Sequence, residues 1–131
     1  MGKNIFADAP VIYSYTRAQA LEDGVLIDVT EQAKGVGFKV PVAVGDTLYY
    51  QYIVPSKNLA GQSLEGRLHD VLFLAYLAAM KSHGHRVIFD CDFVMEDGQD
   101  GQVIQTVSIV AVIDGGDDGA PVITICLPGD E

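Results

Sequence analysis

Residues 64–95 read LEGRLHDVLFLAYLAAMKSHGHRVIFDCDFVM, and this stretch decides the fold. Over residues 64–82 the apolar side chains recur with the spacing of an α-helix, which predicts one long helix that ends at Gly84. Over residues 86–95 apolar and polar side chains alternate, which is typical of a strand with one buried face. A helix followed directly by such a strand indicates an α+β domain.

The predicted long helix is apolar on two sides. At about 100° per residue, six residues share one face: Leu68, Val71, Leu72, Ala75, Ala78 and Ala79. Phe73, Leu74 and Leu77 lie on the opposite side, where a surface helix is normally polar. Either a second layer of the same chain or a second copy of the protein covers them, so these three residues form a candidate oligomer face.

Two more strands follow the first one. Turn-rich segments at 96–102 and 114–121 separate strands predicted over 103–113 and 122–127, so residues 86–127 form a three-stranded antiparallel meander. If the strands pair in order, Cys91 and Cys126 lie two strands apart, at about 9–10 Å. A disulfide requires Cα atoms within about 7 Å, so we expect two unpaired cysteines in the core.

The segment before the long helix predicts shorter elements. Thr16 and Gln19 form a capping box for a short helix that ends at Gly24. A short strand over 25–29 follows, and Thr30 is expected to cap a helix of one or two turns. Residues 41–44 are expected to be extended or loop.

Residues 47–54 (TLYYQYIV) fit two structures, because their spacing suits a helix capped by Asp46 and their composition suits a strand. We expect the helix. The whole chain, residues 1–131, is then a single domain. In it the meander and a short N-terminal strand pack against the long helix and two or three short helices.

Charge is distributed unevenly along the chain. The net charge is −10, yet residues 1–86 hold eight acidic and eight basic residues, whereas residues 87–131 hold ten acidic residues and no Lys or Arg. Direct nucleic-acid binding is disfavoured because it requires clustered Lys and Arg. An acidic face suits a basic protein partner, and the alternative is that the charge serves solubility alone.

The meander predicts where this charge gathers. Strand order places the 96–100 turn and the 130–131 tail at one end of the sheet, and the 114–118 turn at the other. The candidate interaction residues in the two turns are Glu96, Asp97, Asp100, Asp114, Asp117 and Asp118.

The start of the long helix carries a polar constellation. Glu65 and His69 are spaced i, i+4, and Arg67 and Asp70 are spaced i, i+3, so each pair can form on the helix surface. These four residues are ordinary surface pairs or a recognition patch. No catalytic motif, metal site or cofactor site is predicted. The chain shows no signal-peptide pattern or membrane-spanning stretch, so a cytoplasmic location is expected.

Three blocks of the sequence carry a resemblance: IYSYTRAQALEDGVLIDVT at 12–30, EGRLHDVL at 65–72 and DDGAPVITI at 117–125. They resemble a family of small uncharacterised proteins, a domain of unknown function, found in bacterial genomes, plasmids and phages. This chain departs from that pattern at Leu48 and His69, where relatives often carry tryptophan. The resemblance implies no functional residues, and it implies a mobile-element setting with a role in host–element conflict or plasmid maintenance.

Three functions therefore stay open. The first is a non-enzymatic acidic interaction protein that binds a basic protein, in its sharp form a charge mimic of the anti-restriction or anti-CRISPR kind. The second is a small enzyme or ligand binder with a pocket near Arg67, His69 and Asp70. The third is a structural homo-oligomer.

Overall fold

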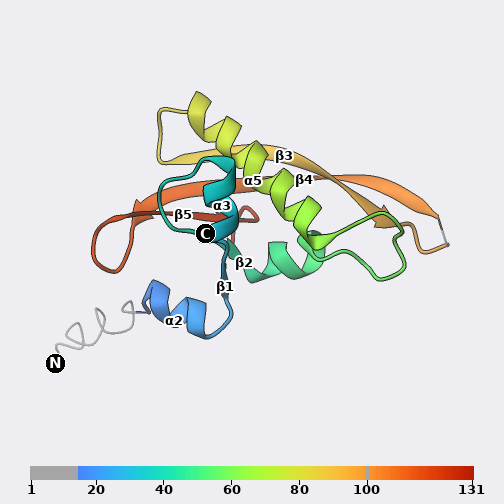
Figure 1. Cartoon of the computed structure of the whole chain (residues 1–131), viewed down its shortest axis with the longest axis horizontal. Helices are drawn as coiled ribbons and strands as arrows, with labels where there is room; N and C mark the ends of the chain where they lie inside the picture. The colour runs from blue at the N-terminus through green and yellow to red at the C-terminus, as the bar shows by residue number, and fades with distance from the viewer. Residues whose placement is uncertain (1–14, 100) are drawn as a thin grey trace.

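The structure, a computed structural model, describes residues 15–99 and 101–131. Its strands form one five-stranded sheet in the order β1-β2-β5-β4-β3 (Figure 1). The strands are β1 (Leu26–Asp28), β2 (Val42–Gly45), β3 (Arg86–Glu96), β4 (Gln102–Gly115) and β5 (Pro121–Cys126). The helices are α2 (Arg17–Glu22), α3 (Thr30–Val36), α4 (Asp46–Leu48), the π-helical turn η1 (Tyr49–Ile53) and α5 (Leu64–Lys81).

The expected α+β architecture is confirmed. Strands β3, β4 and β5 pair antiparallel in chain order, and α5 covers the sheet as the sequence predicted. The short N-terminal strand exists, but it joins the meander only through β2, which pairs antiparallel with β1 and parallel with β5.

Strand β2 occupies the segment expected to be extended or loop. All four of its residues are buried. A strand covered on both faces has no polar alternation, so its short apolar run carries no period that distinguishes it from a loop.

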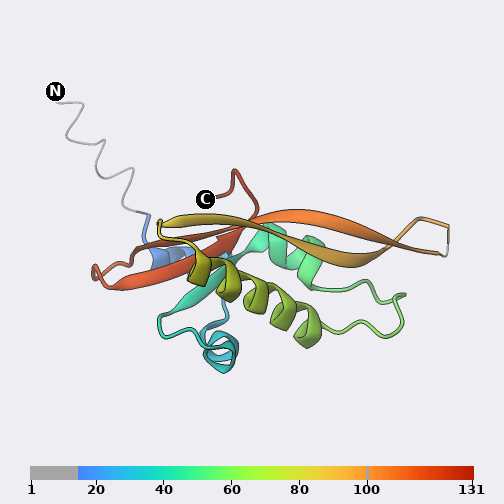
Figure 2. The same ribbon diagram turned by 90° about the horizontal axis from the view of Figure 1, so that it is seen from above.

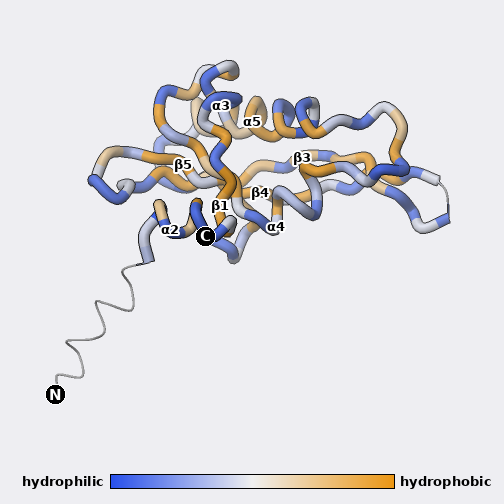
Figure 3. The backbone as a smooth tube through the Cα atoms, turned by 60° about the horizontal axis from the view of Figure 1, so that its bottom comes forward, coloured by the Kyte–Doolittle hydropathy of each residue, from blue (hydrophilic) through white to orange (hydrophobic). Residues whose placement is uncertain are grey.

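The main core lies between the sheet and the helices α5 and α3, which lie on one side of it (Figure 2). Leu68, Val71, Leu72 and Ala75 of α5 are buried there, as the helical pattern predicted. Ser63 caps α5 by accepting a hydrogen bond from the Gly66 amide at 3.0 Å. Hydrophobic residues are concentrated in the middle of α5 and in the middle of the sheet, whereas the two hairpin ends are hydrophilic (Figure 3).

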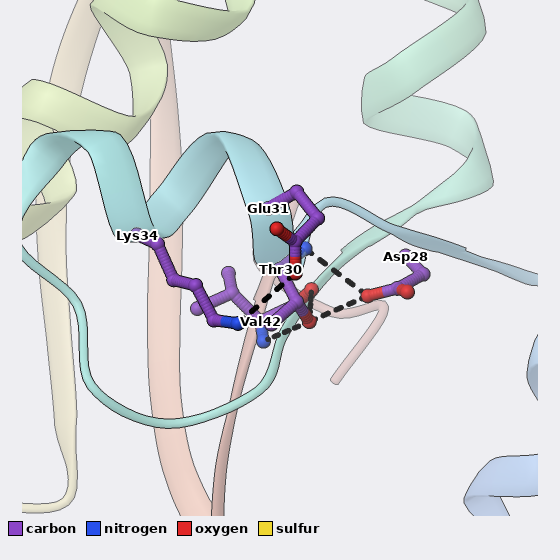
Figure 4. A network of polar contacts seen from close by, with 5 residues as sticks. All are labelled: Asp28, Thr30, Glu31, Lys34 and Val42. Carbon is purple, nitrogen blue, oxygen red and sulfur yellow. Dashed lines mark hydrogen bonds and ion pairs between the residues drawn. The ribbon is translucent and has the colours of Figure 1, made fainter.

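The capping box of α2 is confirmed, because the Thr16 hydroxyl accepts from the Gln19 amide and the Gln19 side chain accepts from the Thr16 amide. The expected role of Thr30 is wrong. Thr30 is the first residue of α3, and the Asp28 carboxylate accepts from its amide at 3.1 Å and from its hydroxyl at 2.5 Å (Figure 4). The Thr30 hydroxyl thereby bridges to the Val42 amide, which ties α3 to β2.

Residues 47–54 are helical up to Ile53, as expected, and the helix continues from α4 into η1. Asp46 does not cap it. Gly45 holds the cap position without a side-chain hydrogen bond, and Asp46 is the first helical residue.

Cys91 and Cys126 are buried and unpaired, as their separation by β4 predicted. Burial raises the pKa of each thiol to about 11.

Since the thiolate is the reactive species, we expect neither cysteine of the native protein to react with DTNB at pH 8 and both to react in denaturant. Raised pKa values favour the protonated native state, so these thiols should make stability fall as pH rises from about 9 through about 11. Rapid reaction of the folded protein would contradict this burial.

Candidate functional site

Strands β3 and β4 extend beyond the rest of the sheet. Strand β5 pairs with residues 110–115 of β4, and residues 102–109 pair with β3 alone. The result is a two-stranded ribbon that projects from the domain (Figure 1). One face of the ribbon packs towards α5 through Cys91 and Phe93, and the side chains between them point the other way.

We call this outward side of the ribbon the hairpin face. Its residues are Asp90, Asp92 and Val94 of β3 and Ile104, Thr106 and Ser108 of β4, together with Ile88 of β3 at the base of the ribbon. The alternation in residues 86–95 predicted the outward direction of Asp90 and Asp92, and this is confirmed.

The two aspartates are held by neighbours on the opposite strand. Asp90 pairs in register with Ser108, whose hydroxyl donates to the Asp90 carboxylate at 3.0 Å. Asp92 pairs with Thr106, whose hydroxyl donates at 2.6 Å. These hydrogen bonds orient both carboxylates and leave one oxygen of each free to accept from a ligand.

Apolar side chains flank the aspartates on the hairpin face. Ile88 is 52% exposed and Ile104 is 66% exposed. Exposed isoleucines beside fixed carboxylates form a surface that offers both charge and apolar contact area.

The tip of the ribbon adds further acidic residues. Glu96 is exposed at the end of β3. The Asp97 carboxylate accepts hydrogen bonds from the Gln99 and Gly101 amides at 2.8 and 3.0 Å, so it also shapes the turn. Asp100 lies outside the described residues.

The opposite end of the sheet carries the other three predicted acidic residues, and each of them accepts a hydrogen bond from a backbone amide of the chain. Asp117 accepts from the backbone amides of Arg17 and Ala18 at 2.9 and 3.0 Å, and so caps α2. Asp114 accepts from the Gly115 amide, and Asp118 accepts from the Ala120 amide.

Arg17 brings a positive charge to this end from the N-terminal part of the chain. Its guanidinium donates to the Thr124 hydroxyl at 2.6 Å and to the Ile123 carbonyl at 2.8 Å. Burial lowers the pKa of Arg17, and the nearby carboxylates of Asp117, Asp28 and Asp114 act in the opposite direction. The negative charge around the β4–β5 turn is therefore partly compensated.

The predicted position of the C-terminal tail is wrong. The chain turns back after β5 at Gly129, which has a φ of 96°, and Glu131 forms an ion pair with Arg86 at 2.5 Å. Arg86 pairs with Val112, so the tail lies towards the β4–β5 turn and not at the ribbon tip. The hydrogen bond from Arg86 lowers the pKa of Glu131.

The structure separates the four residues of the predicted recognition patch. Glu65 and His69 line a cavity of about 300 Å³ together with Asp28, Gln32 and Tyr49. This cavity lies between α5, α3, β1 and η1. Asp70 is exposed on α5 and is not among the residues that line it.

Arg67 is buried, which corrects its expected place on the helix surface. Its guanidinium donates to the Tyr52 and Val94 carbonyls and to the Gln62 side chain, and lies 5.6 Å from the centre of the Phe93 ring. Burial lowers the pKa of Arg67. Within residues 15–99 and 101–131 the ion pairs are Lys34–Glu31 and Arg86–Glu131, so the expected Arg67–Asp70 pair does not form.

The predicted oligomer face is partly exposed. Phe73 and Leu77 are 46% and 37% exposed, whereas Leu74 is half-buried against the core. Across the described part of the chain, no second layer buries Phe73 and Leu77, which removes the expectation of one.

Among the described residues, no three His, Cys, Asp or Glu side chains are grouped so that they could hold a metal ion. No helix in the same residues has the length and apolar character needed to cross a membrane.

Comparison with known proteins gives a family and nothing finer. No curated protein and no solved structure matches the chain. Residues 2–131 match a family of unknown function (DUF6573). Since the match covers nearly all 131 residues, the expected membership of such a family is confirmed, and the chain belongs to DUF6573.

Proposed function

We propose that the protein is a non-enzymatic binding protein whose hairpin face and adjoining ribbon tip bind a basic segment of another protein. One observation carries this proposal. Asp90, Asp92, Glu96 and Asp97 lie on one projecting ribbon, and neither ion pair of the described residues involves them. Of the arginine side chains that contact the sheet, Arg17 and Arg86 lie at its opposite end, and Arg67 is buried on the α5 side of the ribbon, where it donates to the Val94 carbonyl.

The chemistry of the hairpin face suits Lys and Arg side chains. Their charged ends pair with carboxylates, and their aliphatic stems cover apolar surface such as Ile88 and Ile104. The carboxylates sit on paired strands and accept hydrogen bonds from Ser108 and Thr106, so little side-chain entropy is lost on binding. A net charge of −10 also speeds encounter with a basic partner.

The sharper form of the proposal is competition with nucleic acid. A partner surface that binds phosphate is rich in Lys and Arg, and the hairpin face offers it carboxylates instead. The sequence resemblance to proteins carried by plasmids and phages favours such a role in conflict between a host and a mobile element.

The test is calorimetric titration with an arginine-rich peptide at low ionic strength. The triple variant Asp90→Asn/Asp92→Asn/Glu96→Gln keeps hydrogen-bond acceptors and leaves the Asp97 turn intact. We expect it to bind the peptide about tenfold more weakly than the natural protein, since each exposed ion pair contributes about 0.2–1 kcal/mol.

The matched control is Glu22→Gln/Asp46→Asn/Asp130→Asn, which changes the net charge of −10 by the same amount away from the hairpin face. This control should bind almost as tightly as the natural protein. Equal loss of affinity in both triple variants would mean that total charge, and not the hairpin face, attracts the peptide.

A further inference from the structure

The outer side of α5 carries an apolar stripe. Phe73, Leu77 and Met80 follow each other at i, i+4 and i+7, and they are 46%, 37% and 67% exposed. His69 extends the stripe by one turn, since its ring stacks on Phe73 with 6.1 Å between centroids. Residues at this spacing lie in one row along a helix. Exposed apolar rows of this kind mark contact surfaces.

The two ends of this stripe carry charges of opposite sign. Glu65 and Asp70 are exposed in the N-terminal half of α5, and Lys81 is exposed at its C-terminal end. The described residues contain no ion pair to Asp70 or Lys81. The outer side of α5 is therefore acidic at one end, apolar in the middle and basic at the other.

A surface with this order complements itself when one copy is turned end to end. We infer that α5 is the interface of a homodimer in which the α5 helices of two copies pack antiparallel. A two-fold axis midway between Phe73 and Leu77 places each Phe73 beside Leu77 of the second copy. The same axis places Asp70 within about one residue, or 1.5 Å along the helix, of the level of Lys81 of the second copy.

The size of the interface sets its strength. Helix α5 has 18 residues, about 27 Å, and exposes one stripe of its surface. Such an area falls below the roughly 800 Å² per partner of a standard interface, so the dimer is weak and depends on concentration. Physiological salt is needed to screen the repulsion between two chains of net charge −10.

Charge reversal gives a direct test by sedimentation velocity over a wide range of protein concentration. Asp70→Lys alone or Lys81→Asp alone places like charges opposite each other at both symmetry-related positions. Each single variant should weaken dimerisation about tenfold. The double variant Asp70→Lys/Lys81→Asp restores opposite charges and should recover the natural dimerisation constant.

The variants separate this inference from the proposed function, because neither residue lies on the hairpin face and peptide binding should be unchanged. Both positions are exposed, and thermal unfolding checks that each variant is folded. A protein that stays monomeric at every concentration would overturn the inference. The inference would also be overturned if the single variants dimerised as tightly as the natural protein. It would be overturned as well if the double variant did not recover the natural dimerisation constant.

Discussion

Replacing Arg67 with methionine is expected to lower the free energy of unfolding by about 3 kcal/mol. Methionine fills much of the same space but donates no hydrogen bonds, so the Tyr52 and Val94 carbonyls lose their guanidinium donor. Each buried acceptor left without a donor costs about 1–3 kcal/mol. Since native domains are stable by only about 5–15 kcal/mol, urea denaturation should resolve the change easily.

The matched control for this substitution is Arg86→Met. Arg86 also forms a polar contact, its ion pair with Glu131, but its side chain is half exposed. An exposed ion pair contributes about 0–1 kcal/mol, so this variant should remain near the natural stability. If both variants lost equal stability, Arg67 would not join η1 and β3 to α5 in the way the structure shows.

Leu72→Ala, as a separate substitution, is expected to lower the free energy of unfolding by about 3–4 kcal/mol. Leu72 is completely buried between α5 and the sheet, and truncation removes apolar contacts and leaves a cavity. Leu77→Ala makes the same chemical change on the same helix at a position that is 37% exposed. At a low protein concentration it should cost less than about 1 kcal/mol. Similar losses in thermal unfolding would mean that the inward side of α5 is wrongly assigned.

The parts of the fold that the sequence predicted are those with a clear period or a local hydrogen bond. The row from Leu68 to Ala75 marks the buried side of α5, and the alternation around Cys91 marks the two faces of β3. The capping box at Thr16 is equally local, because it closes within one helical turn.

The parts that the sequence did not predict depend on contacts between distant residues. Asp117 caps a helix that begins 100 residues earlier in the chain, and no local pattern indicates that contact. Arg67 occupies a flank of α5 from which a long side chain reaches backbone carbonyls, whereas a charged residue on a helix is normally placed at the surface. The reversal at Gly129 moves Glu131 away from the end that strand order indicated.

The candidate site likewise has features that the sequence predicted and features that depend on contacts between distant residues. The outward direction of Asp90 and Asp92 follows from alternation, but the interaction residues predicted from the sequence all lie in the two turns and do not include these two aspartates. Their importance became visible only when Arg17 and Arg86 were found at the other end of the sheet. Charge counted along the chain does not reveal which carboxylates the fold compensates.

Chemical-shift mapping by NMR tests the proposed function most directly. The backbone amides of the labelled protein are followed while an unlabelled arginine-rich peptide is added at low ionic strength. The largest shifts should fall on residues 88–96 and 104–108, and they should shrink in the Asp90→Asn/Asp92→Asn/Glu96→Gln variant. Shifts concentrated on α5, on the cavity beside His69, or around the β4–β5 turn would contradict the assignment of the hairpin face as the binding surface.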